Sequence, residues 1–147
     1  MINKEISVIG LGYIGLPTAA LLANHGYIVN GMDSSEYVVN TLINGKLHIT
    51  EPGLKEYVGS ALKSKKLRVS NELKPADIYI ICVPTPLKTT AIPEPDIKAV
   101  LDTTKNISKI LKDGDIVILE STSPVGTTEK IASILEGIDI DNIHIAY

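Results

Sequence analysis

The 147-residue sequence contains no phenylalanine and no tryptophan, so tyrosine supplies its entire aromatic content of 4%. A core with so few rings must be built from aliphatic side chains, which suits the Ile- and Val-rich strands of a buried parallel sheet. The single cysteine excludes an internal disulfide and fits a reducing compartment. The sequence also lacks a signal-peptide layout before its first apolar run, so a cytoplasmic location is expected.

The sequence has no excess of positive charge. It contains 14 Lys and Arg residues and 17 Asp and Glu residues, which gives a net charge of −3. This balance gives no electrostatic reason to expect a nucleic-acid partner. No apolar run is long enough to cross a membrane. The histidines at 25, 48 and 144 are too scattered for a metal site, and no role is assigned to His48 or Glu51. The length fits one domain with a real core.

The sequence does contain a glycine-rich turn between a short apolar run and an alanine-rich helical pattern. The run at 6–9 predicts a strand, and Gly10, Gly12 and Gly15 complete a G-x-G-x-x-G pattern around a helix start near Ile14. The first glycine permits a tight turn, the second lets the backbone approach a pyrophosphate, and the third lets the helix pack close to the strand. The helix N-terminus would then face the phosphates. A glycine turn made only for packing is the alternative.

An acidic residue ends the second predicted strand, which covers 28–32. Asp33 lies 18 residues after Gly15, close to the spacing expected for a carboxylate on the ribose hydroxyls of a dinucleotide. Ser34 and Ser35 follow it, rather than an arginine. Because a carboxylate repels a 2′-phosphate, the sequence favours NAD over NADP. The alternative is that Asp33 is the N-cap of the helix that starts near Ser35.

Strands and helices alternate along the rest of the sequence. Strands are predicted at 67–69, 77–83, 116–119 and 143–145, helices at about 36–43, 52–62, 96–111 and 128–135, and a loop at 88–96. Ser70 is expected to cap a brief helical turn before Pro75. Short connections between alternating elements imply parallel pairing with right-handed crossovers. The predicted fold class is α/β, a Rossmann-type doubly wound parallel sheet in the strand order 3-2-1-4-5-6 with helices on both faces.

Two more polar stretches follow predicted strands. The stretch 84–86 (Pro-Thr-Pro) follows the fourth strand, and 121–127 follows the fifth. Ligands bind at the carboxyl edge of such a sheet, where the strand order reverses between the first and fourth strands. The glycine turn and Thr85 are therefore expected on either side of one crevice. As alternatives, Thr85 is an ordinary turn residue, and Thr122 and Thr127 cap the last helix.

Taken together, these motifs resemble those of the UDP-glucose/GDP-mannose dehydrogenase family. The resemblance rests on GLGYIGLP at 10–17, VPTP at 83–86 and STSPVGTT at 121–128, and it covers essentially the whole sequence. With Glu120 before it and Ser123 within it, the last motif is most similar to that of the members that act on UDP-N-acetyl-D-mannosamine. UDP-glucose, UDP-N-acetylglucosamine and GDP-mannose are the alternative substrates.

The resemblance implies a four-electron enzyme that oxidises the C6 alcohol of a sugar nucleotide to a carboxylate with two NAD and one water. It implies that the backbone at Tyr13 and Ile14 binds the pyrophosphate and that Asp33 binds the ribose. Thr85 and Thr122 would line the nicotinamide side, and Thr122 would also position a water near the reacting carbon. The full set of implied cofactor contacts is Gly10, Gly12, Tyr13, Ile14, Gly15, Asp33, Thr85 and Thr122, with no metal.

The sequence departs from this family in one decisive respect. The family's nucleophilic cysteine lies in a glycine-rich motif well downstream, with lysine and asparagine partners, and nothing here matches it. Cys82 falls in an apolar run and is expected to be a small core residue. Residues 1–147 are therefore expected to be the N-terminal NAD-binding domain of a longer enzyme, without its dimerisation and UDP-sugar-binding domains. This chain alone is expected to be inactive.

Further expectations concern partners and alternative functions. The full-length protein is expected to form a homodimer or higher homo-oligomer. A stand-alone NAD-sensing module is the non-enzymatic alternative, because it too would lack downstream catalytic residues. Dehydrogenases of 6-phosphogluconate and 3-hydroxyacids also begin with similar glycine turns, but the VPTP and STSPVGTT motifs argue against them.

Overall fold

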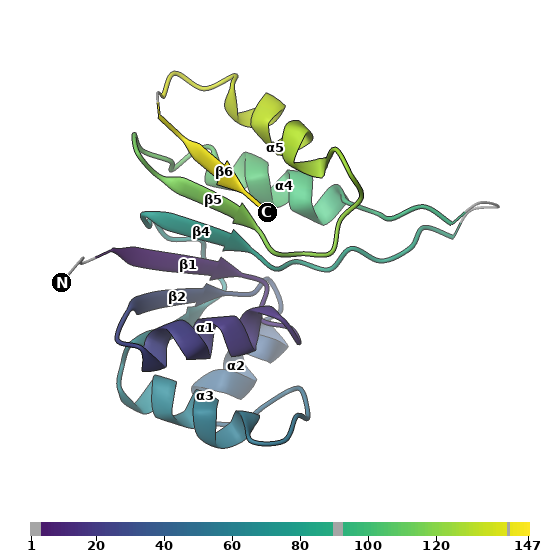
Figure 1. Ribbon diagram of the computed structural model, residues 1–147. Helices are drawn as coiled ribbons and strands as arrows, with labels where there is room; N and C mark the ends of the chain where they lie inside the picture. Colours follow the sequence, from purple (N-terminus) through teal and green to yellow (C-terminus); the bar gives the residue numbers. More distant parts are fainter. Residues whose placement is uncertain (1–3, 90–92, 141) are drawn as a thin grey trace.

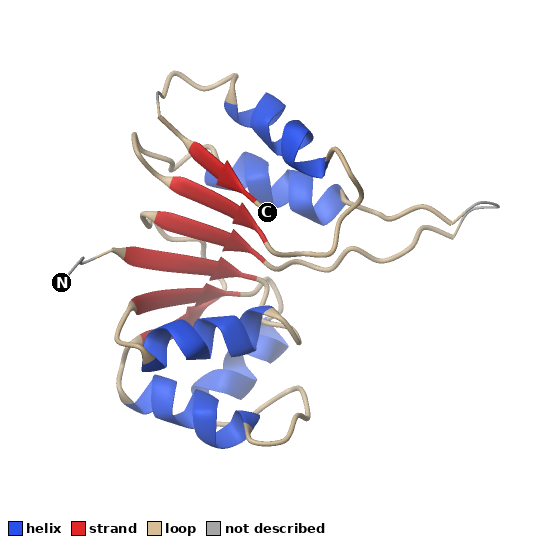
Figure 2. Cartoon of the chain, viewed as in Figure 1, coloured by secondary structure: helices blue, strands red, loops and turns tan. Residues whose placement is uncertain are grey.

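The computed structural model describes residues 4–89, 93–140 and 142–147, and its centre is one parallel sheet. The strands lie in the order β3-β2-β1-β4-β5-β6, and every neighbouring pair is parallel (Figures 1 and 2). Their bounds are β1 Glu5–Ile9, β2 Ile28–Met32, β3 Leu67–Ser70, β4 Ile78–Ile81, β5 Ile116–Leu119 and β6 His144–Ala146. The predicted fold class and strand order are confirmed.

The helices divide between the two faces of the sheet. The helices are α1 Gly15–Asn24, α2 Glu36–Ile43, α3 Leu54–Lys63, α4 Lys98–Ile107 and α5 Thr127–Leu135. The first three pack together beside β1, β2 and β3, and α4 and α5 pack over β4, β5 and β6 on the opposite face (Figure 1). In the part of the chain that the structure describes, no helix is both long and apolar enough to span a membrane.

Alternation along the strands builds two aliphatic cores. In β1, Ile6 and Val8 face α1 and α3, whereas Ile9 faces α4 and α5. The same alternation in β4 buries Ile80 on the first face and Tyr79 on the second. The completely buried Tyr79 side chain accepts a hydrogen bond at its hydroxyl oxygen from the Ala76 N–H, which gives its only polar atom a partner.

Some element boundaries differ from the predicted ones. The helix expected at 96–111 covers Lys98–Ile107, because the Asp96 carboxylate accepts the Lys98 N–H before the helix, and tight turns replace the helix after Ile107. Ser70 caps no helix, and that prediction is wrong. It ends β3, and its hydroxyl donates to the Glu72 carbonyl. Helix α2 has the predicted bounds, and the boundaries of α1, α3 and α5 differ from the predicted ones by at most two residues.

The loop expected at 88–96 is part of an arm that extends away from the sheet (Figure 1). Lys88 N–H donates to the Glu94 carbonyl at 2.8 Å, and Asp96 N–H donates to the Pro86 carbonyl at 2.7 Å. Leu87 and Pro95 form an isolated antiparallel bridge between the two sides. Residues 90–92 of this predicted loop lie outside the described residues.

Candidate functional site

Two glycines of the turn after β1 are required by packing inside the protein. Gly10 has a φ of +94°, and a Cβ there would lie 2.6 Å from the Cys82 carbonyl oxygen. A Cβ at Gly15 would lie 1.8 Å from the Gly10 carbonyl oxygen and 2.9 Å from the Cys82 Cβ. Real Cβ atoms do not approach backbone oxygens so closely. Gly10 and Gly15 therefore allow α1, the turn and the end of β4 to meet.

Gly12 differs from these two glycines, because a Cβ at this position would meet nothing within 4 Å. The backbone here is open on the ligand side of the turn. Tyr13 and Ile14 have exposed side chains, and within 4–89, 93–140 and 142–147 no protein acceptor bonds the N–H groups of Gly12, Tyr13 or Ile14. Helix α1 has no side-chain cap, and Pro17 lies in its first turn. This arrangement suits an anion at the helix N-terminus.

Asp33 joins the end of β2 to the glycine turn. Its Oδ2 atom accepts the Leu11 N–H at 2.9 Å, and its Oδ1 atom accepts the Ser35 N–H at 2.9 Å. The alternative that Asp33 is the N-cap of α2 is wrong, because Ser35 is the N-cap and its hydroxyl oxygen accepts the Val38 N–H. Each carboxylate oxygen has a second lone pair, so the half-buried Asp33 can still accept ribose hydroxyls.

His48 also forms a hydrogen bond to the glycine turn, and the sequence did not predict this contact. Its Nε2 atom lies 2.9 Å from the Leu11 carbonyl oxygen. Because a carbonyl only accepts hydrogen bonds, Nε2 carries the proton. Leu11 is therefore bonded at its N–H by Asp33 and at its carbonyl by His48. No local pattern marks this contact, since His48 lies in a loop 37 residues away along the chain.

The loops after β4 and β5 lie side by side at the same edge of the sheet. The Thr85 hydroxyl donates to the Thr122 carbonyl oxygen at 2.6 Å. Close by, the Ser121 hydroxyl donates to the Val83 carbonyl oxygen at 2.7 Å and lies 3.2 Å from that of Ile81. Since β1 and β4 are neighbours, the glycine turn and these two loops border the point where the strand order reverses.

The alternative that Thr122 and Thr127 cap the last helix is wrong. Gly126, with a φ of +87°, is the N-cap of α5, and no side chain accepts a hydrogen bond from its first turn. Thr127 is the first helical residue, and its hydroxyl donates to the Pro124 carbonyl at 2.7 Å. A glycine in the left-handed region lets the chain turn into the helix without a hydroxyl cap. Thr122 is exposed beside Thr85 instead.

Cys82 is buried, as expected, and lies under the glycine turn. Its thiol donates to Glu120 Oε2 at 3.1 Å, and the Thr18 hydroxyl donates to Glu120 Oε1 at 3.1 Å. Burial, followed by the hydrogen bond and the charge of Glu120, raises the pKa of the Cys82 thiol far above its usual range. A thiolate is the reactive form of cysteine. Cys82 is therefore a packing residue that also links β4 to Glu120, and a poor nucleophile.

Alkylation of the folded protein tests this description of Cys82. At pH 8 the thiol is expected to react with iodoacetamide about 100-fold or more slowly than it does in the urea-unfolded chain. The raised pKa sets the sign, because it lowers the thiolate fraction at every pH below the folded-state pKa. Mass spectrometry of the alkylated fraction over time provides the rates. Equal rates in the folded and unfolded chains would contradict the buried, hydrogen-bonded thiol.

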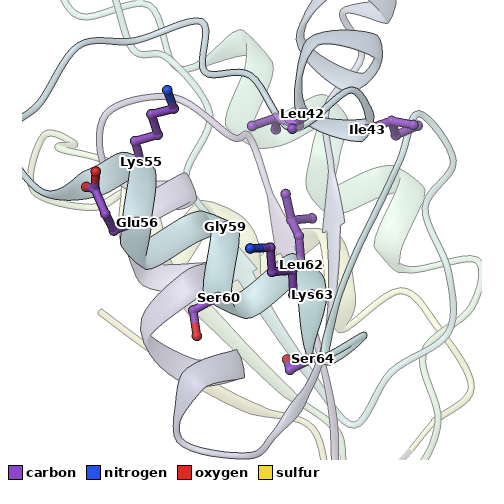
Figure 3. A pocket seen from close by; sticks show the side chains of 10 residues that line it. Leu42, Ile43, Lys55, Glu56, Gly59, Ser60, Leu62, Lys63 and Ser64 are labelled. Atoms are coloured by element: carbon purple, nitrogen blue, oxygen red, sulfur yellow. The ribbon is translucent and has the colours of Figure 1, made fainter.

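Outside this edge of the sheet, the described residues form a surface depression but no cluster of metal-ligating side chains. No group of three or more His, Cys, Asp or Glu side chains within the described ranges could hold a metal ion. A surface depression of about 1070 Å³ lies between the end of α2 and α3, well away from the glycine turn. Figure 3 shows it open between Leu42 and Ile43 on one side and the α3 side chains on the other.

Known proteins are similar to this chain in sequence and in fold. The family model described as the UDP-glucose/GDP-mannose dehydrogenase family, NAD binding domain, matches residues 4–146. The UDP-N-acetyl-D-mannosamine dehydrogenase of Methanococcus maripaludis is 49% identical over 130 residues, 87% of this chain and 30% of the relative. That of Methanococcus aeolicus is 48% identical over 147 residues, 99% of this chain and 33% of the relative.

Solved structures that resemble this chain include dehydrogenases of the same kind as these sequence relatives. The UDP-N-acetyl-mannosamine dehydrogenase of Staphylococcus aureus matches with a TM-score of 0.91 and 35% identity, over 97% of this chain and 35% of that one. The UDP-D-ManNAc dehydrogenase of Pyrococcus horikoshii matches with a TM-score of 0.88 and 37% identity, over 96% and 35%. This chain spans about a third of the length of these relatives. The chain belongs to the UDP-glucose/GDP-mannose dehydrogenase family and is the NAD-binding domain of that family.

Proposed function

We propose that residues 1–147 are the N-terminal domain of a longer NAD-dependent UDP-sugar 6-dehydrogenase. The full-length protein oxidises UDP-N-acetyl-D-mannosamine to UDP-N-acetyl-D-mannosaminuronate with two NAD and one water. The names of the most similar relatives support this substrate, and the chain spans only about a third of their length. The proposal extends to a cytoplasmic homodimer or higher homo-oligomer in polysaccharide biosynthesis, with the sugar nucleotide bound mainly by the absent domains.

One observation carries this proposal: four chemical features gather at one edge of the sheet. These are the N–H groups after Gly12, which bond to no acceptor among the described residues, the Asp33 carboxylate, and the adjacent Thr85 and Thr122. The N–H groups of Tyr13 and Ile14 bind the pyrophosphate, and Asp33 accepts the adenosine ribose hydroxyls. Thr85 and Thr122 border the nicotinamide, which accepts a hydride when the cofactor is bound. Thr122 also positions the water.

The chain on its own is expected to bind NAD without oxidising any sugar nucleotide. Its only thiol, Cys82, is buried and bonded to Glu120, and so supplies no nucleophile. Absorbance at 340 nm, which follows NADH, should stay flat with UDP-N-acetylmannosamine, UDP-N-acetylglucosamine or UDP-glucose. The full-length protein assayed on the same three substrates should prefer the first. Production of NADH by the 147-residue chain would show that the oxidation needs no further domain, which would contradict this proposal.

Replacing Asp33 with alanine tests the cofactor site directly. Hydrogen bonds to a charged group contribute about 1.5–3 kcal/mol, so NAD affinity should fall by roughly 10- to 150-fold. The affinity for NADP should fall much less, because the substitution also removes the carboxylate that repels the 2′-phosphate of NADP. Titration calorimetry with both cofactors gives the ratio of the two affinities. Ser34→Ala is the matched control, since Ser34 is the exposed next residue.

The ratio separates a ribose contact from a structural role of Asp33. The carboxylate also holds the Leu11 and Ser35 N–H groups, so its loss disturbs the turn itself. A disturbed turn weakens NAD and NADP equally and leaves the ratio unchanged. That outcome would show that Asp33 does not contact the cofactor. If the unmodified chain failed to bind NAD at millimolar concentration, the proposed cofactor site itself would be contradicted.

A further inference from the structure

The peptide group that joins Leu11 to Gly12 lies at the centre of the glycine turn, and a side chain bonds its carbonyl. The completely buried Leu11 side chain belongs to the core beside α1, and Asp33 accepts the Leu11 N–H at 2.9 Å. The Leu11 carbonyl oxygen lies 2.9 Å from His48 Nε2. The next carbonyl, that of Gly12, accepts the Leu16 N–H at 3.1 Å and so belongs to the start of α1. His48 therefore fixes the direction of the Leu11 carbonyl.

His48 is held in place by its neighbours in the loop between α2 and α3. Leu47 and Ile49, on either side of it, both pack against the core beside α1. The His48 Nδ1 atom is buried and has no hydrogen-bond partner among the described residues, so the ring makes one polar contact, through Nε2. A buried polar atom without a partner costs free energy. Since the two apolar neighbours anchor the loop without the histidine, an imidazole kept at this cost points to a role in the turn itself.

Peptide geometry extends the effect of this bond to the Gly12 N–H. A trans peptide group is planar, so the Gly12 N–H points opposite to the Leu11 carbonyl and hence away from His48. That N–H has no acceptor among the described residues, and it directly precedes the N–H groups of Tyr13 and Ile14 at the start of α1. Successive backbone N–H groups of this kind bind anions. The Gly12 N–H therefore adds a third donor to the proposed pyrophosphate site.

Glycine at position 12 leaves this peptide group free to turn over. Gly12 has no Cβ, and a Cβ there would meet nothing within 4 Å, so neither chirality nor packing at this residue opposes the rotation. A peptide that has turned over presents its carbonyl oxygen where the N–H was, and that oxygen repels a phosphate. The same rotation breaks the hydrogen bond between His48 and Leu11. That hydrogen bond therefore opposes the rotation.

We propose that His48 is a positioning residue for the cofactor: by bonding the Leu11 carbonyl, it keeps the Gly12 N–H directed at the pyrophosphate of NAD. The inference rests on the proposed function, because it requires the pyrophosphate to lie against this turn. Without the His48 donor the turned-over peptide becomes populated, and the apparent affinity falls with the fraction of the protein that can still bind. Asp33 bonds the Leu11 N–H, in the preceding peptide group, so its contribution through the ribose is separable from that of His48.

Substitution of His48 in the full-length protein tests this role. His48→Ala should weaken the binding of NAD and of ADP-ribose each by about tenfold, the effect of losing one hydrogen bond. The affinity for adenosine, which has no phosphate, should change by less than about twofold, because its contacts do not involve the Gly12 N–H. Titration calorimetry measures the first two affinities, and competition with NAD measures the third. A turn that collapsed would also displace Asp33 and would weaken adenosine as much as ADP-ribose.

Two amide variants separate the loss of the donor from the change in side-chain size. The amide nitrogen of glutamine reaches the place of Nε2, whereas that of asparagine reaches only the place of Nδ1, the atom without a partner. His48→Gln should therefore restore NAD affinity to within about threefold, and His48→Asn should resemble His48→Ala. His25→Ala is the matched control and should keep full affinity. The His25 Nδ1 atom also lies close to a backbone carbonyl oxygen, that of Leu21 at 2.8 Å, but at the other end of α1.

The possible results distinguish this inference from the proposed function. Unchanged NAD affinity in His48→Ala, an equal loss for adenosine, or the same loss in His48→Gln as in His48→Asn would each overturn the inference. If His48→Ala does not fold, the comparison of the two amide variants decides in the same way. If Asp33→Ala weakens NAD binding and His48→Ala does not, the inference fails and the proposed function stands. An unmodified protein that binds no NAD would overturn both.

Discussion

Replacing Gly15 with alanine is expected to destabilise the protein by about 3 kcal/mol or more. A Cβ at this position would lie 1.8 Å from the Gly10 carbonyl oxygen, and the next nearest atom is the Cβ of Cys82. The obstacle is backbone on one side and, on the other, the buried residue that directly follows β4, so no flexible side chain can move aside. Relief requires α1 to shift away from β1 and β4, which exposes the core around Leu16 and Ala19. Urea unfolding followed by circular dichroism measures the loss.

Gly12 provides the matched control for this experiment. It belongs to the same turn, but a Cβ there meets nothing within 4 Å and its φ lies outside the left-handed region. The free energy of unfolding of Gly12→Ala should therefore stay within about 0.5 kcal/mol of the unmodified protein. Gly10→Ala should resemble Gly15→Ala, since Gly10 combines a φ of +94° with a contact of 2.6 Å. A normal unfolding midpoint for Gly15→Ala would show that the turn is looser than described.

The fold could be predicted from the sequence because its determinants are local. Aliphatic runs of four or five residues, helical periodicity and glycines at the turns determine the type of each element. Once the elements alternate, the preference for right-handed crossovers leaves few strand orders. The observed order β3-β2-β1-β4-β5-β6 is the predicted one. The apolar composition of β4 indicated its central place, and it lies between β1 and β5.

The candidate site was less predictable, since several of its contacts join distant parts of the chain. The spacing of Asp33 from the glycine turn was visible in the sequence, but its bond to the Leu11 N–H is a consequence of how β2 lies beside β1. The bond from His48 to the Leu11 carbonyl depends on how the loop after α2 folds back. Such loop contacts have no periodic signature, because they depend on three-dimensional packing rather than on sequence neighbours.

Hydroxyl side chains misled the sequence analysis for one physical reason. A serine or threonine near a helix start can accept an N–H or donate to a carbonyl, and the sequence does not distinguish the two. Ser35 accepts and is a cap, whereas Thr127 and Ser70 donate to nearby carbonyls. At α5 the left-handed Gly126 already makes the turn into the helix.

Gly12→Ala is expected to lower NAD affinity by about 100-fold while leaving the fold intact, which corresponds to roughly 2.7 kcal/mol. The reason is that no described atom lies within 4 Å of a Cβ placed at Gly12, which directly precedes the N–H groups of Tyr13 and Ile14. A methyl group there occupies the space through which a pyrophosphate reaches those N–H groups. Titration calorimetry with NAD measures the affinity, and circular dichroism confirms that the variant is folded.

The expected pattern depends on the position of the added methyl group rather than on the loss of a glycine as such. Gly59→Ala is the control for that distinction, because Gly59 lies on α3, also has nothing within 4 Å of a Cβ, and is far from the turn. It should keep full NAD affinity and a free energy of unfolding equal to or above that of the unmodified protein, since alanine favours a helix more than glycine does. Unchanged NAD affinity in Gly12→Ala would place the pyrophosphate elsewhere. Loss of affinity in Gly12→Ala alone fits a phosphate bound directly against the backbone of this turn.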